Sequence, residues 1–122
     1  WARAQGYQLA VASSTRAPMV HKLLARAGID GYFSAVVGGD MVPDAKPAPD
    51  MIDTAILMSG ARETGGRFAM VGDSSYDVRA ASNANVPVVA VSFGYNDVPA
   101  DELGADAVID HYDQLLSTLE GL

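Results

Sequence analysis

Two aspartates stand close together where a buried strand is expected to end. The stretch "FAMVGDSSYDVRAA" at residues 68–81 is apolar for four positions and then places Asp73 and Asp77 four residues apart. At a strand end that leads into a helix, both carboxylates can point at one spot, and such oxygens suit Mg²⁺. The alternative is helix capping by Ser74 or Ser75, with Asp77 favouring the helix dipole. Capping leaves Asp73 unexplained, because a carboxylate leaving a buried strand is costly to desolvate without a cation or donors.

A second candidate lies in "VASSTR", where two hydroxyls follow another apolar run. Ser13 and Ser14, together with free backbone N–H groups at the turn into a helix near Ala17, would form an anion seat. The alternative is that one serine only caps the helix.

The third candidate is Lys46 in "DAKPAPD", one of two lysines in the chain, with Pro47 directly after it. A lysine near a phosphate neutralises its charge and pairs with nearby carboxylates. The alternative is a solvated surface lysine. Pro47 could follow a cis bond, but most peptide bonds before proline are trans, so the sequence alone does not support one.

Strands and helices alternate along the chain, which predicts an α/β fold with a parallel sheet flanked by helices. Apolar runs without alternation, typical of strands covered on both faces, end just before the candidate residues. The expected strands are 7–12, 34–37, 68–71, 86–91 and a short one at 107–109. Helical periodicity marks the segments 20–27, 52–59 and 115–122, with Gly28 and Gly60 as helix ends. No shift in composition marks a domain boundary within the 122 residues, so we expect all of them to belong to one domain.

Composition excludes several classes of protein. Fifteen acidic against eight basic residues give a net charge of −7, which argues against a nucleic-acid or anionic-membrane partner held by charge. No cysteine is present, and no apolar run approaches the length of a membrane span. His21 and His111 are expected on the surface, and "FGYNDVP" at 93–99 reads as a turn.

Taken in order, "VASS", "KPAPD" and "GDSSYD" resemble the second, third and fourth motifs of the haloacid dehalogenase-like hydrolases. The resemblance covers nearly the whole chain. Within the family, "VVGGDMV" followed by "KPAPD" and "GYN" is similar to the phosphoglycolate phosphatases, while "VASS" is also similar to sugar-phosphate phosphatases and phosphoglucomutases. The resemblance implies a Rossmann-like core and a cytoplasmic, Mg²⁺-dependent phosphatase of a small phosphorylated metabolite, acting through an aspartyl-phosphate.

The resemblance also implies a role for each candidate. Ser13 and Lys46 would be catalytic and would bind the phosphoryl group together with Ser14. Asp73 would bind the metal, with Asp77 as the second ligand or as holder of a bound water.

The family's first motif, an Asp-x-Asp pair that supplies the nucleophile, is missing; "IDGYF" at 29–33 lacks the second aspartate. The chain starts at Trp1 in what reads as the last turn of a helix ending at Gly6. We therefore expect residues 1–122 to be the C-terminal part of a core domain, with the nucleophile and cap in an N-terminal segment of the same protein. By this resemblance the sheet would lack its central strand, so the chain alone is expected to be inactive and unstable.

Two other functions stay open. A phosphomutase of the beta-phosphoglucomutase type would share the aspartyl-phosphate but return the group to a sugar. A non-catalytic domain would keep the fold and bind phosphate or a partner.

Overall fold

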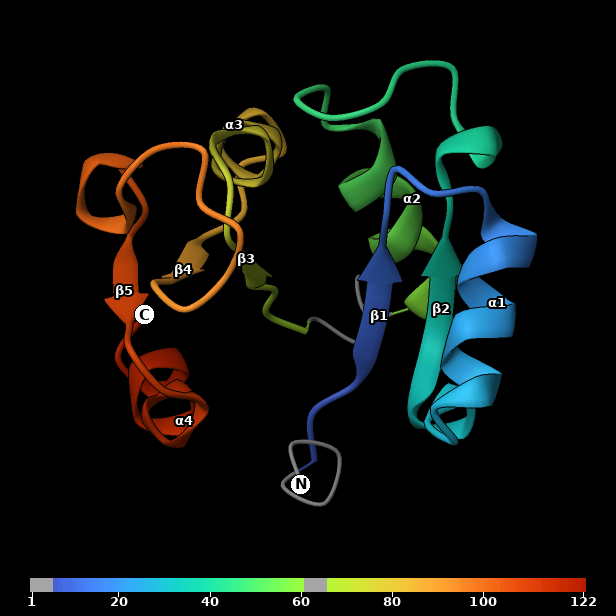
Figure 1. The fold of residues 1–122 in the computed structure, drawn as a ribbon, viewed down its shortest axis with the longest axis horizontal. Helices are drawn as coiled ribbons and strands as arrows, with labels where there is room; N and C mark the ends of the chain where they lie inside the picture. Colours follow the sequence, from blue (N-terminus) through green and yellow to red (C-terminus); the bar gives the residue numbers. More distant parts are fainter. Residues whose placement is uncertain (1–5, 61–65) are drawn as a thin grey trace. The chain divides into compact units, whose positions relative to one another are not determined.

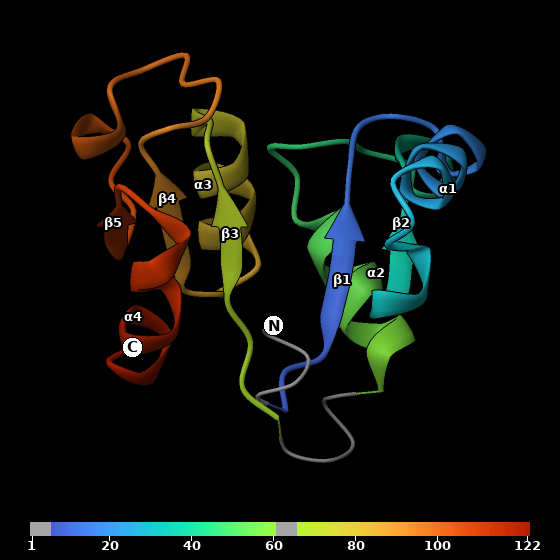
Figure 2. The same ribbon diagram turned by 60° about the horizontal axis from the view of Figure 1, so that its bottom comes forward.

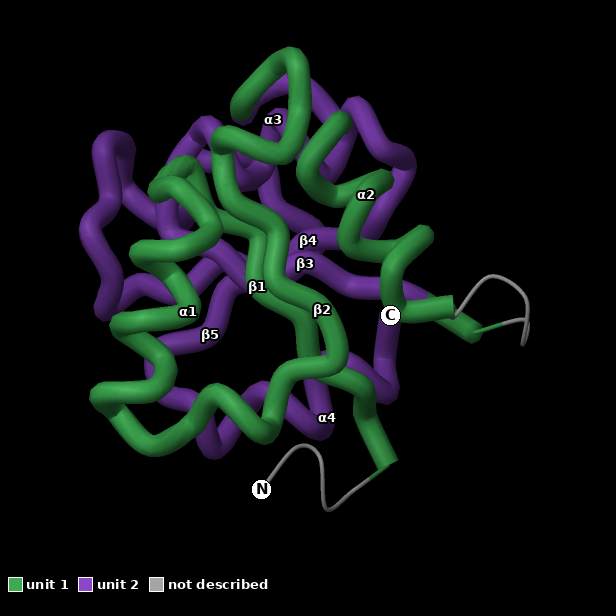
Figure 3. Tube along the Cα trace, turned by 90° about the vertical axis from the view of Figure 1, so that its right-hand side faces the viewer, with its two compact units in different colours: residues 1–45, 50–67 green, residues 46–49, 68–122 purple. Residues whose placement is uncertain are grey.

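The structure is a computed structural model that describes residues 6–60 and 66–122. It divides into two compact units, shown in different colours in Figure 3. Unit 1 holds residues 1–45 and 50–67, and unit 2 holds residues 46–49 and 68–122. That both units are parts of one core domain stays a prediction. The helical turn expected before Gly6 lies outside the described residues.

Unit 1 is a pair of parallel strands covered by a helix on each face (Figures 1 and 3). Its elements are β1 (Leu9–Ala12), α1 (Ala17–Arg26), β2 (Phe33–Val37) and α2 (Asp50–Ser59), with short 3₁₀ turns η2 (Asp30–Tyr32) and η3 (Gly39–Met41). The core of unit 1 lies between β2 and α2, where Val37 and Met51 are fully buried and Ala55 nearly so. Because the core fixes the strand ends, it also places the loop that leaves β1.

The helices of unit 1 end within one residue of the predicted segments, while α1 begins three residues and α2 two residues earlier than predicted. Pro18 occupies the first turn of α1, where its missing N–H has no partner to lose. Gly28 and Gly60 follow the two helices with φ of +73° and +70°, which residues with a side chain rarely adopt. The loops at both helix ends are thus set by local sequence.

Unit 2 is a three-stranded parallel sheet in the order β3-β4-β5 (Figure 2). Its elements are β3 (Met70–Gly72), α3 (Ser75–Asn83), β4 (Val88–Val91), β5 (Ala107–Ile109) and α4 (Leu115–Glu120), with 3₁₀ turns η4 (Ala100–Glu102) and η5 (Tyr112–Gln114). The middle strand β4 is buried on both faces. On one face Val89 and Val91 join Ile109 in a cluster packed by the leucines of α4, while α3 packs against β3 and β4.

The predicted α/β fold with parallel strands is confirmed, although β1, β3 and β4 begin two residues later than expected. Met70 N–H donates to the carbonyl of Pro87 at 2.8 Å, and the β3–β4 ladder starts there. Proline has no N–H with which to extend a ladder, so neither strand reaches its predicted start at residue 68 or 86. Within residues 6–60 and 66–122, β1 pairs only with β2 and β3 only with β4, so each has one side without a strand partner. Among these residues no helix is both long and apolar enough to span a membrane.

Candidate active site

In unit 2 the structure brings Lys46 and Asp77 together as an ion pair. Lys46 Nζ donates to Asp77 Oδ1 at 2.6 Å, and the two side chains are only 10% and 12% exposed. The alternative of a solvated surface lysine is therefore wrong. The Lys46–Pro47 bond is cis, a form that the sequence alone did not support. Asn83 Nδ2 on α3 donates to the Pro47 carbonyl at 2.9 Å.

Asp77 also closes the first turn of α3, so the capping interpretation is confirmed for this residue. Its Oδ2 accepts hydrogen bonds from the backbone N–H groups of Asp73 and Ser74, at 3.1 and 3.3 Å, and from Ser74 Oγ at 3.2 Å. The Asp77 N–H in turn donates to Ser74 Oγ at 3.3 Å, which completes a capping box. Both oxygens of Asp77 are thus engaged.

The environment of Asp77 pulls its pKa in opposite directions. Burial raises the pKa, whereas the hydrogen bond and the charge of Lys46, with the donors from Asp73 and Ser74, lower it; the net result is a lowered pKa. Asp77 is accordingly ionised at neutral pH and holds the ammonium of Lys46 in place. Because an ammonium has three N–H donors and only one is bound by a described residue, Lys46 keeps two for a phosphate oxygen.

Asp73 differs from Asp77 because only one of its oxygens is held. Its Oδ2 accepts from the backbone N–H of Tyr95 at 2.9 Å, while Oδ1 takes no hydrogen bond from any residue that the structure describes. Asp73 follows β3 directly and is half-buried. Asp73 therefore has one carboxylate oxygen without a described donor, while its backbone N–H contacts Asp77 of the ion pair.

The donor for Asp73 comes from the loop after β4, residues 92–99, which we call the β4 loop. Sequence reasoning treated this loop as a simple turn and missed its contacts with residues 73–75. Asn96 donates to the Asp73 carbonyl, and Asp97 accepts from the N–H and hydroxyl of Ser75. The bonds from Ser75 lower the pKa of Asp97. A usable signal was the position of "GYND" after a strand, since ligands in open α/β sheets bind beyond the carboxyl ends of the strands.

The residues of unit 2 fit a Mg²⁺ ion in part. No group of three or more His, Cys, Asp or Glu side chains suited to a metal occurs within the described ranges. The open Oδ1 of Asp73 is a hard oxygen of the kind that Mg²⁺ prefers, and this ion usually keeps several waters and binds one or two carboxylates. Asp73 is thus the better candidate ligand, since Asp77 would have to release Lys46 or its backbone donors.

In unit 1, Ser13 and Ser14 follow β1 in the loop that leads to α1. Ser13 Oγ accepts from the N–H of Thr15 at 3.2 Å, and neither serine caps α1, so the capping alternative is wrong here. The Ala17 N–H, expected to be free, donates to Asp40 Oδ1 at 2.7 Å. Among the described residues the N–H groups of Ser14 and Arg16 have no acceptor, so they and the Ser13 hydroxyl are the remaining candidates for the predicted anion seat.

The loop after β2 fits tightly against this seat. A Cβ added at Gly38 would lie 2.2 Å from the Ala17 nitrogen, and one at Gly39 would lie 2.4 Å from the Ser14 carbonyl oxygen. The N–H of Gly39 donates to the Thr15 carbonyl at 3.0 Å. The hydrogen bond from Ala17 also lowers the pKa of Asp40, which is exposed. The residues of "GGD" at 38–40 thus fix the backbone of the loop between β1 and α1.

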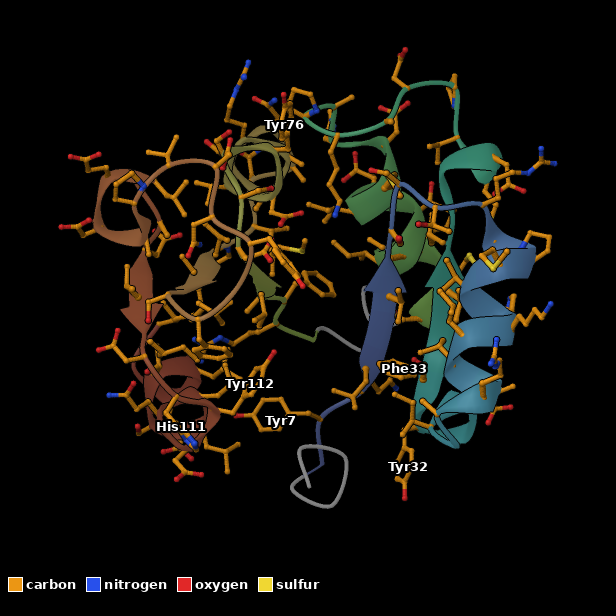
Figure 4. The ribbon with its side chains drawn as sticks, in the orientation of Figure 1. Tyr7, Tyr32, Phe33, Tyr76, His111 and Tyr112 are labelled. Atoms are coloured by element: carbon orange, nitrogen blue, oxygen red, sulfur yellow. The ribbon has the colours of Figure 1, made fainter. Side chains whose placement is uncertain are left out.

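A small hollow of about 150 Å³ in unit 1 lies away from these residues. It is lined by Tyr7, Gln8, Leu9, Gly31, Tyr32, Phe33 and Ser34. Figure 4 shows Tyr7, Tyr32 and Phe33 at the amino ends of β1 and β2, whereas Ser13 follows the carboxyl end of β1. The hollow is therefore no part of the candidate site.

Three of the predicted residues are thus clustered in unit 2, and two lie in unit 1. The sequence profile of the haloacid dehalogenase-like hydrolases matches residues 1–91. The chain belongs to this family. In this haloacid dehalogenase-like chain, the predicted motifs follow β1, precede α2 and follow β3 in the expected order. That Ser13 meets Lys46 and Asp73 around one phosphoryl group stays a prediction.

Known members of the family support this assignment. The phosphoglycolate phosphatase of Agrobacterium fabrum is 38% identical over 117 residues, which are 93% of this chain and 48% of that protein. That of Caulobacter vibrioides is 37% identical over 107 residues, 88% of this chain and 44% of that protein. The chain spans about half the length of the curated relatives it matches.

Solved structures show the same fold. One, described as a predicted phosphoglycolate phosphatase from Haemophilus somnus, has a TM-score of 0.80 at 32% identity and covers 97% of this chain and 52% of its own. CbbY from Rhodobacter sphaeroides, solved in complex with phosphate, has a TM-score of 0.78 at 28% identity and covers 98% and 54%. The haloacid dehalogenase-like core is therefore shared over nearly all of this chain.

Proposed function

We propose that this chain is part of a Mg²⁺-dependent phosphomonoester hydrolase that acts on a small phosphorylated metabolite, of the phosphoglycolate or sugar-phosphate type. Its family membership and the phosphoglycolate phosphatases among its relatives support this proposal. The observation that carries it is the buried Lys46–Asp77 pair beside an aspartate with one open oxygen. A cytoplasmic location belongs to the same proposal.

Each candidate residue has a task that its surroundings suit. Lys46, held by Asp77, would offer its two remaining N–H donors to the transferring phosphoryl group and offset its negative charge. The Ser13 hydroxyl and the N–H of Ser14 would bind other phosphoryl oxygens. Asp77 acts through Lys46 and the first turn of α3.

Asp73 would hold the metal through Oδ1. A bound Mg²⁺ supplies charge that neutralises phosphate oxygens and fixes their orientation for in-line attack. The nucleophile is not among the candidate residues, because the chain has no Asp-x-Asp motif. In this proposal an aspartate outside residues 1–122 attacks the phosphorus, the ester P–O bond breaks and the metabolite leaves as an alcohol. Water then attacks the aspartyl-phosphate, which releases inorganic phosphate and regenerates the aspartate. Residues 1–122 by themselves are accordingly expected to be inactive.

The test is phosphate release from an aryl phosphate by the full product of the gene that encodes this chain, with and without a chelator. We expect activity that needs Mg²⁺, is lost in Asp73→Asn and is strongly reduced in Lys46→Met. Asp101→Asn, a change of the same kind at an exposed residue of unit 2, should keep wild-type activity. Activity that resists chelation and persists in Asp73→Asn would reject the metal role, and transfer to a sugar instead of water would identify a mutase.

A further inference from the structure

The β4 loop is tied to the turn after β3 by two of its own side chains. Asn96 Nδ2 donates to the Asp73 carbonyl at 2.6 Å and to the Val91 carbonyl at 3.1 Å. Asp97 accepts from the Ser75 N–H at 2.8 Å and from Ser75 Oγ at 2.5 Å. The bonds to Asp73 and Ser75 join the β4 loop to the residues on either side of Ser74, the N-cap of α3.

The same loop lies against the Asp73 carboxylate. A Cβ added at Gly94 would be 2.4 Å from Asp73 Cβ and 2.6 Å from its Oδ2, so the loop backbone approaches as closely as a glycine allows. The next residue, Tyr95, then donates its N–H to Oδ2 at 2.9 Å. The loop therefore fixes one oxygen of Asp73 and sets the direction of the other.

We propose that Asn96 and Asp97 are positioning residues for Asp73: they hold the β4 loop where the Tyr95 N–H binds Oδ2, and so present Oδ1 to a divalent cation. This inference rests on the proposed function, since the cation is part of it. Partners in the outer shell of a metal site orient the ligand, and losing one typically weakens metal binding about 10- to 100-fold.

The two side chains share this work. Asn96 binds the backbone of Asp73 itself, so its loss frees the loop directly at the carboxylate. Asp97 anchors the far end of the loop to the first residue of α3, where a negative side chain also favours the helix dipole. A loop held only for stability would lose folding free energy without changing cation affinity, which gives the test its discriminating readout.

The experiment titrates the ¹⁵N-labelled full product of the gene that encodes this chain with Mn²⁺, a paramagnetic probe for the site, and follows the amide signals around Asp73. Asn96→Ala and Asp97→Ala are compared with Asp97→Asn, which loses the charge but keeps an acceptor for Ser75. Asp101→Ala is the matched control, because Asp101 is exposed and no described residue bonds to its side chain. Hydrogen exchange of the Tyr95 amide is measured on the same samples without metal.

We expect Mn²⁺ to broaden the signals near Asp73, with affinity about tenfold weaker in Asn96→Ala and Asp97→Ala. Exchange of the Tyr95 amide should be about tenfold faster in both. Asp97→Asn and Asp101→Ala should stay within about twofold of wild type in both measurements. If Asp97→Ala does not fold, Ser75→Ala replaces it with an expected weakening of about threefold.

Wild-type affinity and unchanged Tyr95 exchange in the loop variants would overturn the positioning role and leave the metal role of Asp73 standing. An equal loss in Asp97→Ala and Asp97→Asn would overturn it too, because charge alone would then explain the effect. Absence of broadening near Asp73 in the wild-type chain would instead overturn the metal assignment of the proposed function, and the positioning role with it.

Discussion

The buried ion pair of unit 2 gives the sharpest test of the candidate site. Replacing Lys46 with methionine keeps most of the side chain's length but removes its charge, which leaves Asp77 buried without its counter-ion. Removing one partner of a buried pair typically costs about 3–5 kcal/mol. The three donors on Asp77 Oδ2 continue to stabilise the carboxylate, so we expect a smaller loss of about 2–3 kcal/mol in the free energy of unfolding.

A double-mutant cycle isolates the pair from other effects of each change. Lys46→Met, Asp77→Asn and the double variant are compared with wild type by urea unfolding followed by circular dichroism. We expect a coupling free energy of about 2 kcal/mol, because both side chains are almost fully removed from water and the pair is little screened. Lys22→Met, the same change at the only other lysine, which is exposed on α1, should alter stability by less than about 0.5 kcal/mol.

A coupling free energy below about 0.5 kcal/mol would refute this reasoning. Lys46 and Asp77 would then be solvated independently of each other, and Lys46 would have no fixed position from which to bind a phosphate. The structural basis of the proposed function would be lost with it.

The surroundings of Asp77, Gly94 and Asp40 each give one further prediction. Because the pKa of Asp77 is lowered from 3.8 on folding, its stabilising effect is complete above that pH and is lost as the pH falls through the folded value. Acid unfolding should therefore begin more steeply below pH 3.8 in wild type than in Asp77→Asn, and parallel stability curves would contradict this. Gly94→Ala should lower stability by about 1–3 kcal/mol, because the added Cβ would clash with the Asp73 side chain. Gly31→Ala, where a Cβ meets open space, should be near neutral. Equal effects of the two changes would argue against the close approach of the β4 loop to Asp73. Asp40→Ala should lower the melting temperature by removing the acceptor of the Ala17 N–H, whereas Asp44→Ala at an exposed position of the same loop should not, as thermal unfolding by circular dichroism would show.

Much of the fold could be predicted because local sequence decides it. Apolar runs of strand length mark all five strands, and glycines with positive φ end the first two helices. The boundaries of β3 and β4 could not be predicted from the runs alone. They depend on where Pro87 interrupts the ladder between two strands that are far apart in the sequence.

The candidate site was less accessible to sequence reasoning, for a physical reason. Motif order predicts that Lys46, Asp73 and Asp77 belong to one site, and the structure clusters them in unit 2. It does not predict their partners, because several of the decisive donors are backbone N–H groups, which every residue but proline has. The position of the Tyr95 N–H that binds Asp73 depends on the backbone of a loop 22 residues further along the chain. No residue type in the sequence indicates this contact.

The two aspartates of "GDSSYD" show what this limit means for function. The family resemblance implies that Asp73 binds the metal and that Asp77 is its second ligand or holds a bound water. In the structure Asp77 receives the lysine and three donors from its own turn, whereas Asp73 receives one N–H from the β4 loop. A carboxylate whose oxygens are both engaged acts best as a fixed counter-ion, and one with a free oxygen acts best as a ligand. The division of roles therefore follows from how many donors reach each carboxylate, so that Asp73→Asn should abolish cation binding while Asp77→Asn should chiefly release Lys46.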